Sequence, residues 1–212
     1  MKKIVCCFLL FVIFSIFKAD LLTAENEWKK LKTVNGVEII HRDVEGSSLD
    51  EIKAFYTINA PIENVFSLVK NGNVHKRWIA ITSESSVFKT IDDEHQIVYY
   101  ELNLPFPLSK RYLVTKLENY ANWETGETIT TIKSIDPEEC KKCPEDIFRK
   151  DMPRAKELNY TVTLNRLNSD QTKVTFQAHG ELGIDFPDFI KKQLICVQPY
   201  LTMKKLAKQS CK

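Results

Sequence analysis

The sequence predicts an α+β domain built on one strongly curved antiparallel sheet, with an amphipathic helix near its start and another at its end. Short strand-like segments follow one another through tight connections, without long helices between most of them, which is typical of antiparallel sheets. Apolar residues recur at helical spacing after Pro61 and again after Pro187. A sheet of six or more strands must bury one face, and the terminal helix is its natural cover.

Residues 1–24 have the pattern of a secretory signal peptide. Lys2 and Lys3 precede an apolar run from Ile4 to Phe17, which is shorter than the roughly 20 residues needed to span a membrane. Ala24 supplies a small residue before a cleavage point. We therefore expect export to the periplasm or the medium, with residues 25–212 as one domain. The alternative is an uncleaved segment that tethers the domain to a membrane.

The charge balance argues against a nucleic-acid partner. Three of the 30 basic residues and one of the 28 acidic residues lie in 1–24, so the remaining chain is neutral. Nucleic-acid binders normally carry a strong basic excess. The whole chain of 212 residues is 43% hydrophobic, and it is long enough for one domain with a core of its own.

The elements along the mature chain follow from alternation, helical spacing and turn residues. We expect a short helix over 25–32, closed by Asn35-Gly36, and a helix that starts at Pro61 and ends before Asn71-Gly72. A second short helix starts near Asn73 and carries Trp78. The predicted strands cover residues 37–43, 49–59, 83–91, 96–104, 111–120, 127–135, 158–167 and 172–180.

The last helix is predicted over 187–208. Its apolar stripe is Ile190, Leu194, Val197 and Leu201. Pro199 interrupts the stripe and should kink the helix or remove one backbone hydrogen bond. The lysines lie largely off the stripe, which favours a solvated face over a surface for anionic lipid.

Motifs of common enzymes and cofactor sites are missing. The chain has no phosphate-cradling glycine loop, no Gly-x-Ser-x-Gly elbow, no His-Glu-x-x-His zinc motif and no calcium-loop pattern. Its four histidines are scattered. We therefore expect no cofactor, no metal and no enzymatic activity.

Four cysteines remain in the mature chain. In an oxidising compartment an even number suggests disulfides, with three pairings open. Structural disulfides or idle thiols are favoured over a redox dithiol at Cys140 and Cys143, because Pro137 and Pro144 place that pair in a loop. A zinc site would need two further ligands nearby. The candidate disulfide residues are Cys140, Cys143, Cys196 and Cys211.

Several segments, in their order and spacing, resemble the START family of steroidogenic acute regulatory-related lipid-transfer domains. Residues 35–42 (NGVEIIHR) look like the opening strand of that family, and residues 60–66 (APIENVF) look like its first long helix, followed by Trp78. Residues 104–111 (LPFPLSKR) are similar to a Pro-rich segment that ends in arginine. One departure is Tyr112, where the family usually has an acidic residue.

The resemblance implies a helix-grip fold whose curved sheet wraps the last helix around a tunnel, with the 105–109 connection and that helix as the lid. We expect a monomer that binds and transfers one hydrophobic ligand, lipid or sterol-like, without catalysis and with transient membrane contact. The residues we expect in the tunnel and lid are Trp78, Tyr99, Glu101, Phe106, Arg111, Phe186, Phe189 and Ile190.

Two alternatives stay open. A cavity enzyme of the polyketide cyclase type would need titratable groups inside the tunnel, and Arg111 and Glu101 are the candidates if their strand faces point inward. An adaptor domain would instead have its cavity filled by side chains. The ligand itself is set by tunnel volume and a few polar groups.

Overall fold

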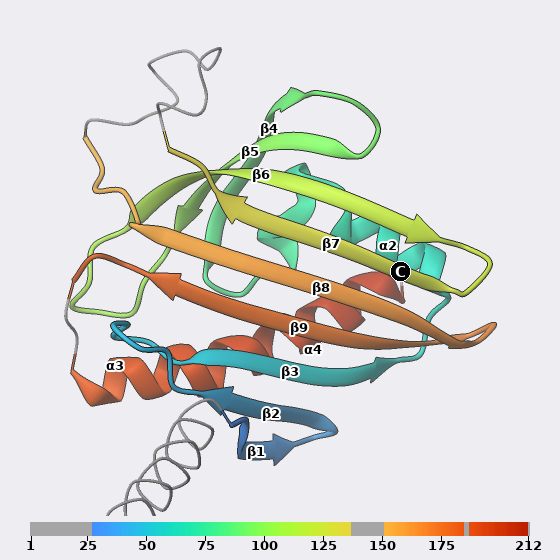
Figure 1. Ribbon diagram of the computed structural model, residues 1–212, viewed down its shortest axis with the longest axis horizontal. Coiled ribbons are helices and arrows are strands. Elements are labelled where there is room, and N and C mark those ends of the chain that lie inside the picture. Colours follow the sequence, from blue (N-terminus) through green and yellow to red (C-terminus); the bar gives the residue numbers. More distant parts are fainter. Residues whose placement is uncertain (1–26, 137–150, 185–186, 212) are drawn as a thin grey trace, which may run out of the picture.

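The computed structural model describes residues 27–136, 151–184 and 187–211, and in this part of the chain nine strands form one open antiparallel sheet. The order across the sheet is β1-β2-β3-β9-β8-β7-β6-β5-β4 (Figure 1). The strands are β1 (Lys29–Val34), β2 (Val37–Arg42), β3 (Glu51–Ile58), β4 (Thr82–Thr90), β5 (His95–Leu102), β6 (Arg111–Asn122), β7 (Glu127–Ser134), β8 (Glu157–Asn168) and β9 (Gln171–Glu181).

Consecutive strands pair throughout the sheet except between β3 and β4. There, the helix α2 (Ile62–Val69) and the 3₁₀ helix η1 (Gly72–Arg77) carry the chain to the opposite edge, and β9 later returns to pair with β3. Each strand predicted after residue 36 is present, and its ends lie within two residues of the prediction. The predicted α+β class with an antiparallel sheet is confirmed.

The helix predicted over 25–32 is wrong where the structure describes it, because Lys29–Val34 is the edge strand β1. Asn35 and Gly36 both have positive φ angles, 47° and 80°, which is the type I′ hairpin turn that an Asn-Gly pair favours. The register of β1 shifts between Lys30 and Lys32. This irregularity removes the strict alternation by which a strand is recognised in sequence.

The C-terminal helix runs through α3 (Asp188–Lys192), a π-helical turn η3 (Gln193–Val197) and α4 (Gln198–Ser210). Pro199 stands in the first turn of α4, where its missing amide matters least. The amide of Gln198 donates to the carbonyl of Gln193, five residues back. The widened π turn therefore accommodates the proline that the sequence marked as a disturbance.

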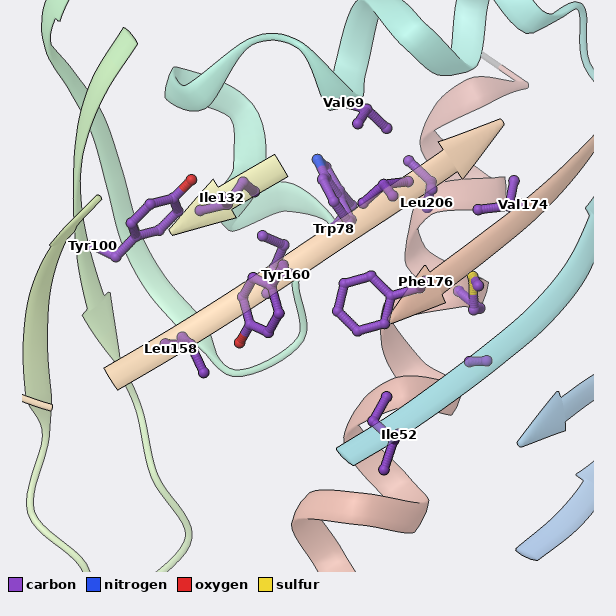
Figure 2. Close-up of a cluster of buried hydrophobic side chains, with 14 of the residues drawn as sticks. Ile52, Val69, Trp78, Tyr100, Ile132, Leu158, Tyr160, Val174, Phe176 and Leu206 are labelled. Atoms are coloured by element: carbon purple, nitrogen blue, oxygen red, sulfur yellow. The ribbon is translucent and has the colours of Figure 1, made fainter. Parts of the chain in front are cut away.

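The core lies between the inner face of the sheet and the helices α2 and α4. Figure 2 shows Ile52, Tyr160 and Phe176 pointing from the strands into this space, with Trp78 and Leu206 among them. The packing joins β3, β8 and β9 to α2 and α4. None of the helices in the described ranges has both the length and the apolar character needed to cross a bilayer.

Candidate functional site: a pocket beneath the C-terminal helix

An apolar pocket lies between the sheet and the first half of the C-terminal helix. Its floor comes from β3, β8 and β9, one side from residues 79–81, and its roof from η3 and the start of α4. The apolar lining residues are Leu49, Ile52, Ile79, Ile81, Leu158, Phe176, Ala178, Leu182, Leu194, Ile195 and Pro199. The polar ones are Asp50, Tyr160, His179, Gln198 and Thr202.

The pocket is narrower than the tunnel that the sequence resemblance implies. The space between its lining atoms, including the open mouth, is about 610 Å³, of which about 80 Å³ is accessible to the centres of water molecules. One water needs roughly 10–15 Å³ by that measure, whereas drug-sized ligands occupy pockets of about 300–1,000 Å³. A lipid-sized guest therefore requires the roof to move away from the floor.

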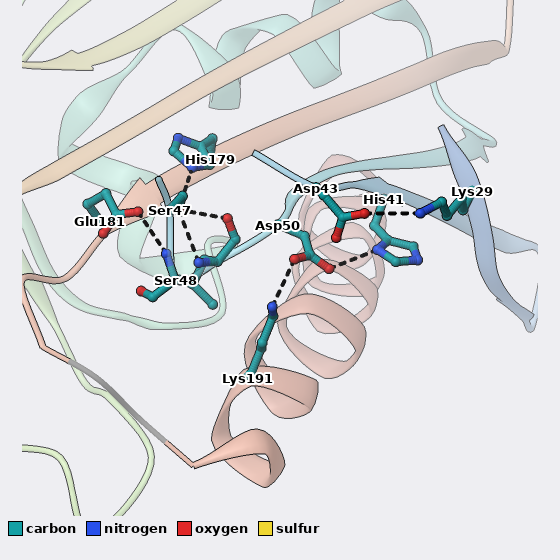
Figure 3. A network of polar contacts seen from close by, with 10 residues as sticks. Lys29, His41, Asp43, Ser47, Ser48, Asp50, His179, Glu181 and Lys191 are labelled. Atoms are coloured by element: carbon teal, nitrogen blue, oxygen red, sulfur yellow. Dashed lines mark hydrogen bonds and ion pairs between the residues drawn. The ribbon is translucent and has the colours of Figure 1, made fainter. Parts of the chain in front are cut away.

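Asp50 links the wall of this pocket to the helix α3 (Figure 3). Its Oδ1 lies 3.0 Å from Nζ of Lys191 on α3, and its Oδ2 lies 2.8 Å from Nδ1 of His41 on β2. The Asp50 side chain is only 9% exposed, so both contacts form in a partly desolvated setting. The pair with Lys191 joins α3 to the residue that directly precedes β3.

Two further polar groups of the wall are already engaged. The Nε2 atom of His179 lies 3.0 Å from the hydroxyl of Ser47, in the loop before β3. The hydroxyl of Thr202 accepts a hydrogen bond of 3.1 Å from the backbone amide of Ala80, which joins α4 to the segment after Trp78. These contacts join the walls of the pocket to neighbouring segments of the chain.

Gln198 and Tyr160 are two further polar residues of the pocket wall. The Oε1 atom of Gln198 is buried and meets no hydrogen-bond donor among the described residues. Burial raises the pKa of the Tyr160 hydroxyl far above its ordinary value, so this group is neutral at physiological pH. Both residues line the pocket, and no motif in the sequence marks either as a site residue.

The structure places Tyr99 and Glu101 outside the tunnel, which corrects their prediction as ligand residues. On β5 the residues that face the core are Val98, Tyr100 and Leu102, so Tyr99 and Glu101 lie on the opposite face. Tyr99 packs there in a small cluster with Ile97 and Val114. The Tyr99 hydroxyl donates to Glu101 at 3.2 Å.

Trp78, Arg111 and Ile190 lie on the inner side without lining the pocket. Trp78 and Ile190 are completely buried. Arg111 pairs with the inward-facing Leu102, and its Nε is buried without a hydrogen-bond partner among the described residues. The structure therefore assigns Trp78 to the core, and it brings neither Arg111 nor Glu101 into the wall of the pocket.

The two phenylalanines predicted for the lid are on the surface. Phe106, in the loop between β5 and β6, is 90% exposed, and Phe189 on α3 is 60% exposed. The start of β6 and the end of β9 lie at the same end of the sheet, as their register across β7 and β8 shows. Phe186 and the predicted signal peptide lie outside the described residues.

Cys196 and Cys211 are free thiols. They stand 15 residues apart on one helix, about 22 Å along its axis at 1.5 Å per residue, whereas bridged cysteines have Cα atoms within about 7 Å. Of the possible pairings, a disulfide between Cys196 and Cys211 is therefore excluded. Cys140 and Cys143 lie outside the described residues, so their pairing stays a prediction.

An open antiparallel sheet that wraps a C-terminal helix over an apolar pocket is the helix-grip fold, and the chain has this fold in the form found in START domains. A STAR-related lipid transfer protein fragment from Xanthomonas axonopodis matches with a TM-score of 0.74 and 24% identity, over 87% of this chain and 99% of that chain. Human StAR-related lipid transfer protein 5 matches with a TM-score of 0.74 and 15% identity, over 93% and 94% of the two chains.

Other comparisons are less specific. An aromatase/cyclase of Streptomyces shares the fold with a TM-score of 0.52 and 9% identity, over 76% of this chain and 92% of that chain. An uncharacterised protein of Pseudomonas aeruginosa is 23% identical over 180 residues, 85% of each chain. No protein-family model matches the sequence. The START-type fold inferred from the sequence is thus confirmed by structural likeness.

Proposed function

We propose that the chain binds one apolar molecule non-covalently in the pocket beneath its C-terminal helix and carries it through water unchanged. The observation that carries this proposal is the wall itself, which is apolar apart from five residues. Burying an apolar guest there gains roughly 25 cal/mol for each Å² removed from water. The likeness to lipid-transfer proteins supports a lipid or sterol-like guest.

Loading requires the pocket to widen, and α3 is the element best placed to move. Its polar link to the sheet is the pair between Lys191 and Asp50, in which the Lys191 side chain is about a third exposed. Solvent-exposed ion pairs contribute about 1 kcal/mol or less, but Asp50 is only 9% exposed, so separating it from Lys191 costs more than that. Lifting α3 and the π turn behind it would open the roof at the cost of this ion pair and of the buried contacts of Ile190.

Filling the pocket is expected to abolish binding. The change Ala178→Phe places an aromatic ring in the wall from β9, and we expect at least a tenfold loss of affinity for any apolar guest. Thr175→Phe is the matched control, because it adds the same ring to the other face of that strand. Organic extraction of purified protein, followed by mass spectrometry, should recover one apolar molecule from the wild type and the control, and little from Ala178→Phe. Equal recovery from all three would contradict the proposal.

A cavity enzyme is the second candidate, since Asp50 and His179 both line the pocket. Both carboxylate oxygens of Asp50 are held by Lys191 and His41, and His179 is held by Ser47. This engagement favours a structural role for the three contacts. A bound molecule recovered chemically altered by the wild type, but not by Asp50→Asn, would favour the enzyme instead.

The exposed aromatic rings suggest where the carrier touches a membrane. Phe106 precedes the start of β6 and Phe189 follows the end of β9, and these two strand ends lie at the same end of the sheet. Burying a phenylalanine is worth about 1.5–3 kcal/mol. The double variant Phe106→Ala and Phe189→Ala should therefore transfer ligand between vesicles about tenfold more slowly or worse, while its affinity for the ligand in solution stays unchanged. Tyr120→Ala is the control, since Tyr120 is 55% exposed near the other end of β6. Equal transfer rates would refute the contact.

We further propose that residues 1–24 direct export and are removed, so that the domain acts in the periplasm or the medium. Lys2, Lys3 and the apolar run that follows support this proposal. Protein recovered from the periplasm or the medium should have the mass of a chain whose first residue is Glu25. Full-length protein in the membrane fraction would support the tether instead.

A further inference from the structure

The charges around the pocket limit which apolar molecules it accepts. Among the described residues, the wall contains neither lysine nor arginine. Its single carboxylate belongs to Asp50, which already contacts Lys191 and His41 outside the wall. A ligand carboxylate, phosphate or sulfate drawn into this space would face Asp50 without a cation of its own, and an unpaired buried charge is strongly disfavoured.

One polar atom in the wall lacks a partner. Gln198 stands where the π turn meets α4, and its Oε1 is buried with no donor among the described residues. A buried amide oxygen accepts hydrogen bonds and cannot donate them, and leaving it unpaired is costly. Of the other polar residues of the wall, Asp50, His179 and Thr202 already make contacts with residues outside it, and Tyr160 contributes one further hydroxyl group.

We infer that the ligand is an uncharged apolar molecule with one hydroxyl group, and that this hydroxyl donates its hydrogen bond to Oε1 of Gln198. The inference rests on the proposed function and specifies its ligand class. The neutral Tyr160 hydroxyl is compatible with such a ligand, because burial keeps that phenol protonated. Gln198 is then the residue that selects an alcohol over an ether or an acid of the same carbon skeleton.

The test compares molecules that differ only in the polar end. Two series are used, namely cholesterol, its methyl ether and its sulfate, and hexadecanol, its methyl ether and hexadecanoate. Each compound displaces the neutral dye Nile red from the full mature chain. In whichever series binds, the alcohol should bind about tenfold more tightly than the ether, because the ether leaves Oε1 unpaired, and the anion should bind most weakly.

The change Gln198→Met removes the acceptor at nearly constant volume. It should bring the affinity ratio of alcohol to ether close to one while leaving affinity for the ether equal or higher. A merely structural role would lower both affinities together. Gln193→Met is the matched control, since Gln193 lies one π turn earlier on the same helix and outside the pocket wall, and it should keep the tenfold ratio.

The possible results distinguish a failure of the Gln198 inference from a failure of the proposed carrier function. Equal binding of alcohol, ether and anion by the wild type would overturn the role of Gln198 and leave the carrier function standing. Tightest binding of the anion would overturn the uncharged ligand class. Failure of every compound to bind, together with no apolar molecule on extraction, would overturn the carrier function and the inference with it.

Discussion

Replacement of Trp78 by alanine is expected to lower the free energy of unfolding by about 3–5 kcal/mol, the cost of removing a large buried aromatic side chain. Trp78 is 0% exposed, and its ring meets the His75 ring edge-on with centroids 5.1 Å apart. Since it follows η1 and sits between the sheet and α2, its loss would leave a cavity at the centre of the packing (Figure 2). Urea denaturation of wild type and variant measures the difference.

Trp78→Phe separates packing from polar effects. The indole Nε1 is buried without an acceptor among the described residues, so phenylalanine gives up no hydrogen bond and removes an unsatisfied donor. We expect this variant to lose less than half as much stability as alanine does. Because Trp78 is not in the pocket wall, Trp78→Phe should also retain ligand affinity. A stable Trp78→Ala protein, or a Trp78→Phe protein that no longer binds, would place this residue in the ligand site instead.

The order of elements could be predicted because each signal was local. Alternation identified the strands after residue 36, and the stripe from Ile62 to Val69 identified α2. The strand at Lys29–Val34 was missed because a register shift interrupts its alternation and because three lysines crowd it. The Asn35-Gly36 pair was read as the end of a helix, although such a pair between two strands is the strongest local signal for a hairpin.

The face of β5 could not be predicted because both of its sides are apolar. Ile97 and Tyr99 form a small cluster on the outer face, while Val98 and Tyr100 belong to the core. A continuous apolar run carries no information on which residues face inward. Tyr99 and Glu101 were therefore assigned to the tunnel from a strand whose sequence fits both orientations.

The polar residues of the pocket could not be found from sequence, because their role depends on three-dimensional neighbours. No motif or spacing in the sequence marks Asp50. It joins two elements only because the fold brings His41 on β2 and Lys191 on α3 to its carboxylate. Gln198 is distinguished only by what is missing around its Oε1. Absent partners, unlike apolar stripes, have no sequence signature.

A buried histidine makes the stability of the fold depend on pH. His75 is completely buried, with Nε2 2.7 Å from the carbonyl oxygen of Val69 and Nδ1 2.6 Å from the hydroxyl of Tyr100. A carbonyl only accepts, so Nε2 carries the proton and Nδ1 accepts from Tyr100. Burial keeps both groups neutral, because it lowers the pKa of His75 from 6.5 to about 4 and raises the pKa of Tyr100 well above 10.

Between pH 6.5 and 4 the unfolded chain therefore takes up a proton at position 75 and the folded protein does not. The free energy of unfolding contributed by His75 is complete above pH 6.5 and falls as the pH decreases, by about 3 kcal/mol at pH 4, given about 1.4 kcal/mol for each pH unit. Urea denaturation across this range should show the loss on top of that from other groups.

Variants assign that loss to one ring. His75→Gln removes the titration while retaining an amide that can donate to Val69 and accept from Tyr100. It should be less stable than wild type at pH 7 but lose about 3 kcal/mol less on acidification to pH 4. His95→Gln, which changes a partly exposed histidine beside Asp92, should keep most of the slope of the wild type. Parallel slopes for wild type and His75→Gln would show that His75 is also protonated in the folded protein. Its Nδ1 would then not accept a hydrogen bond from Tyr100.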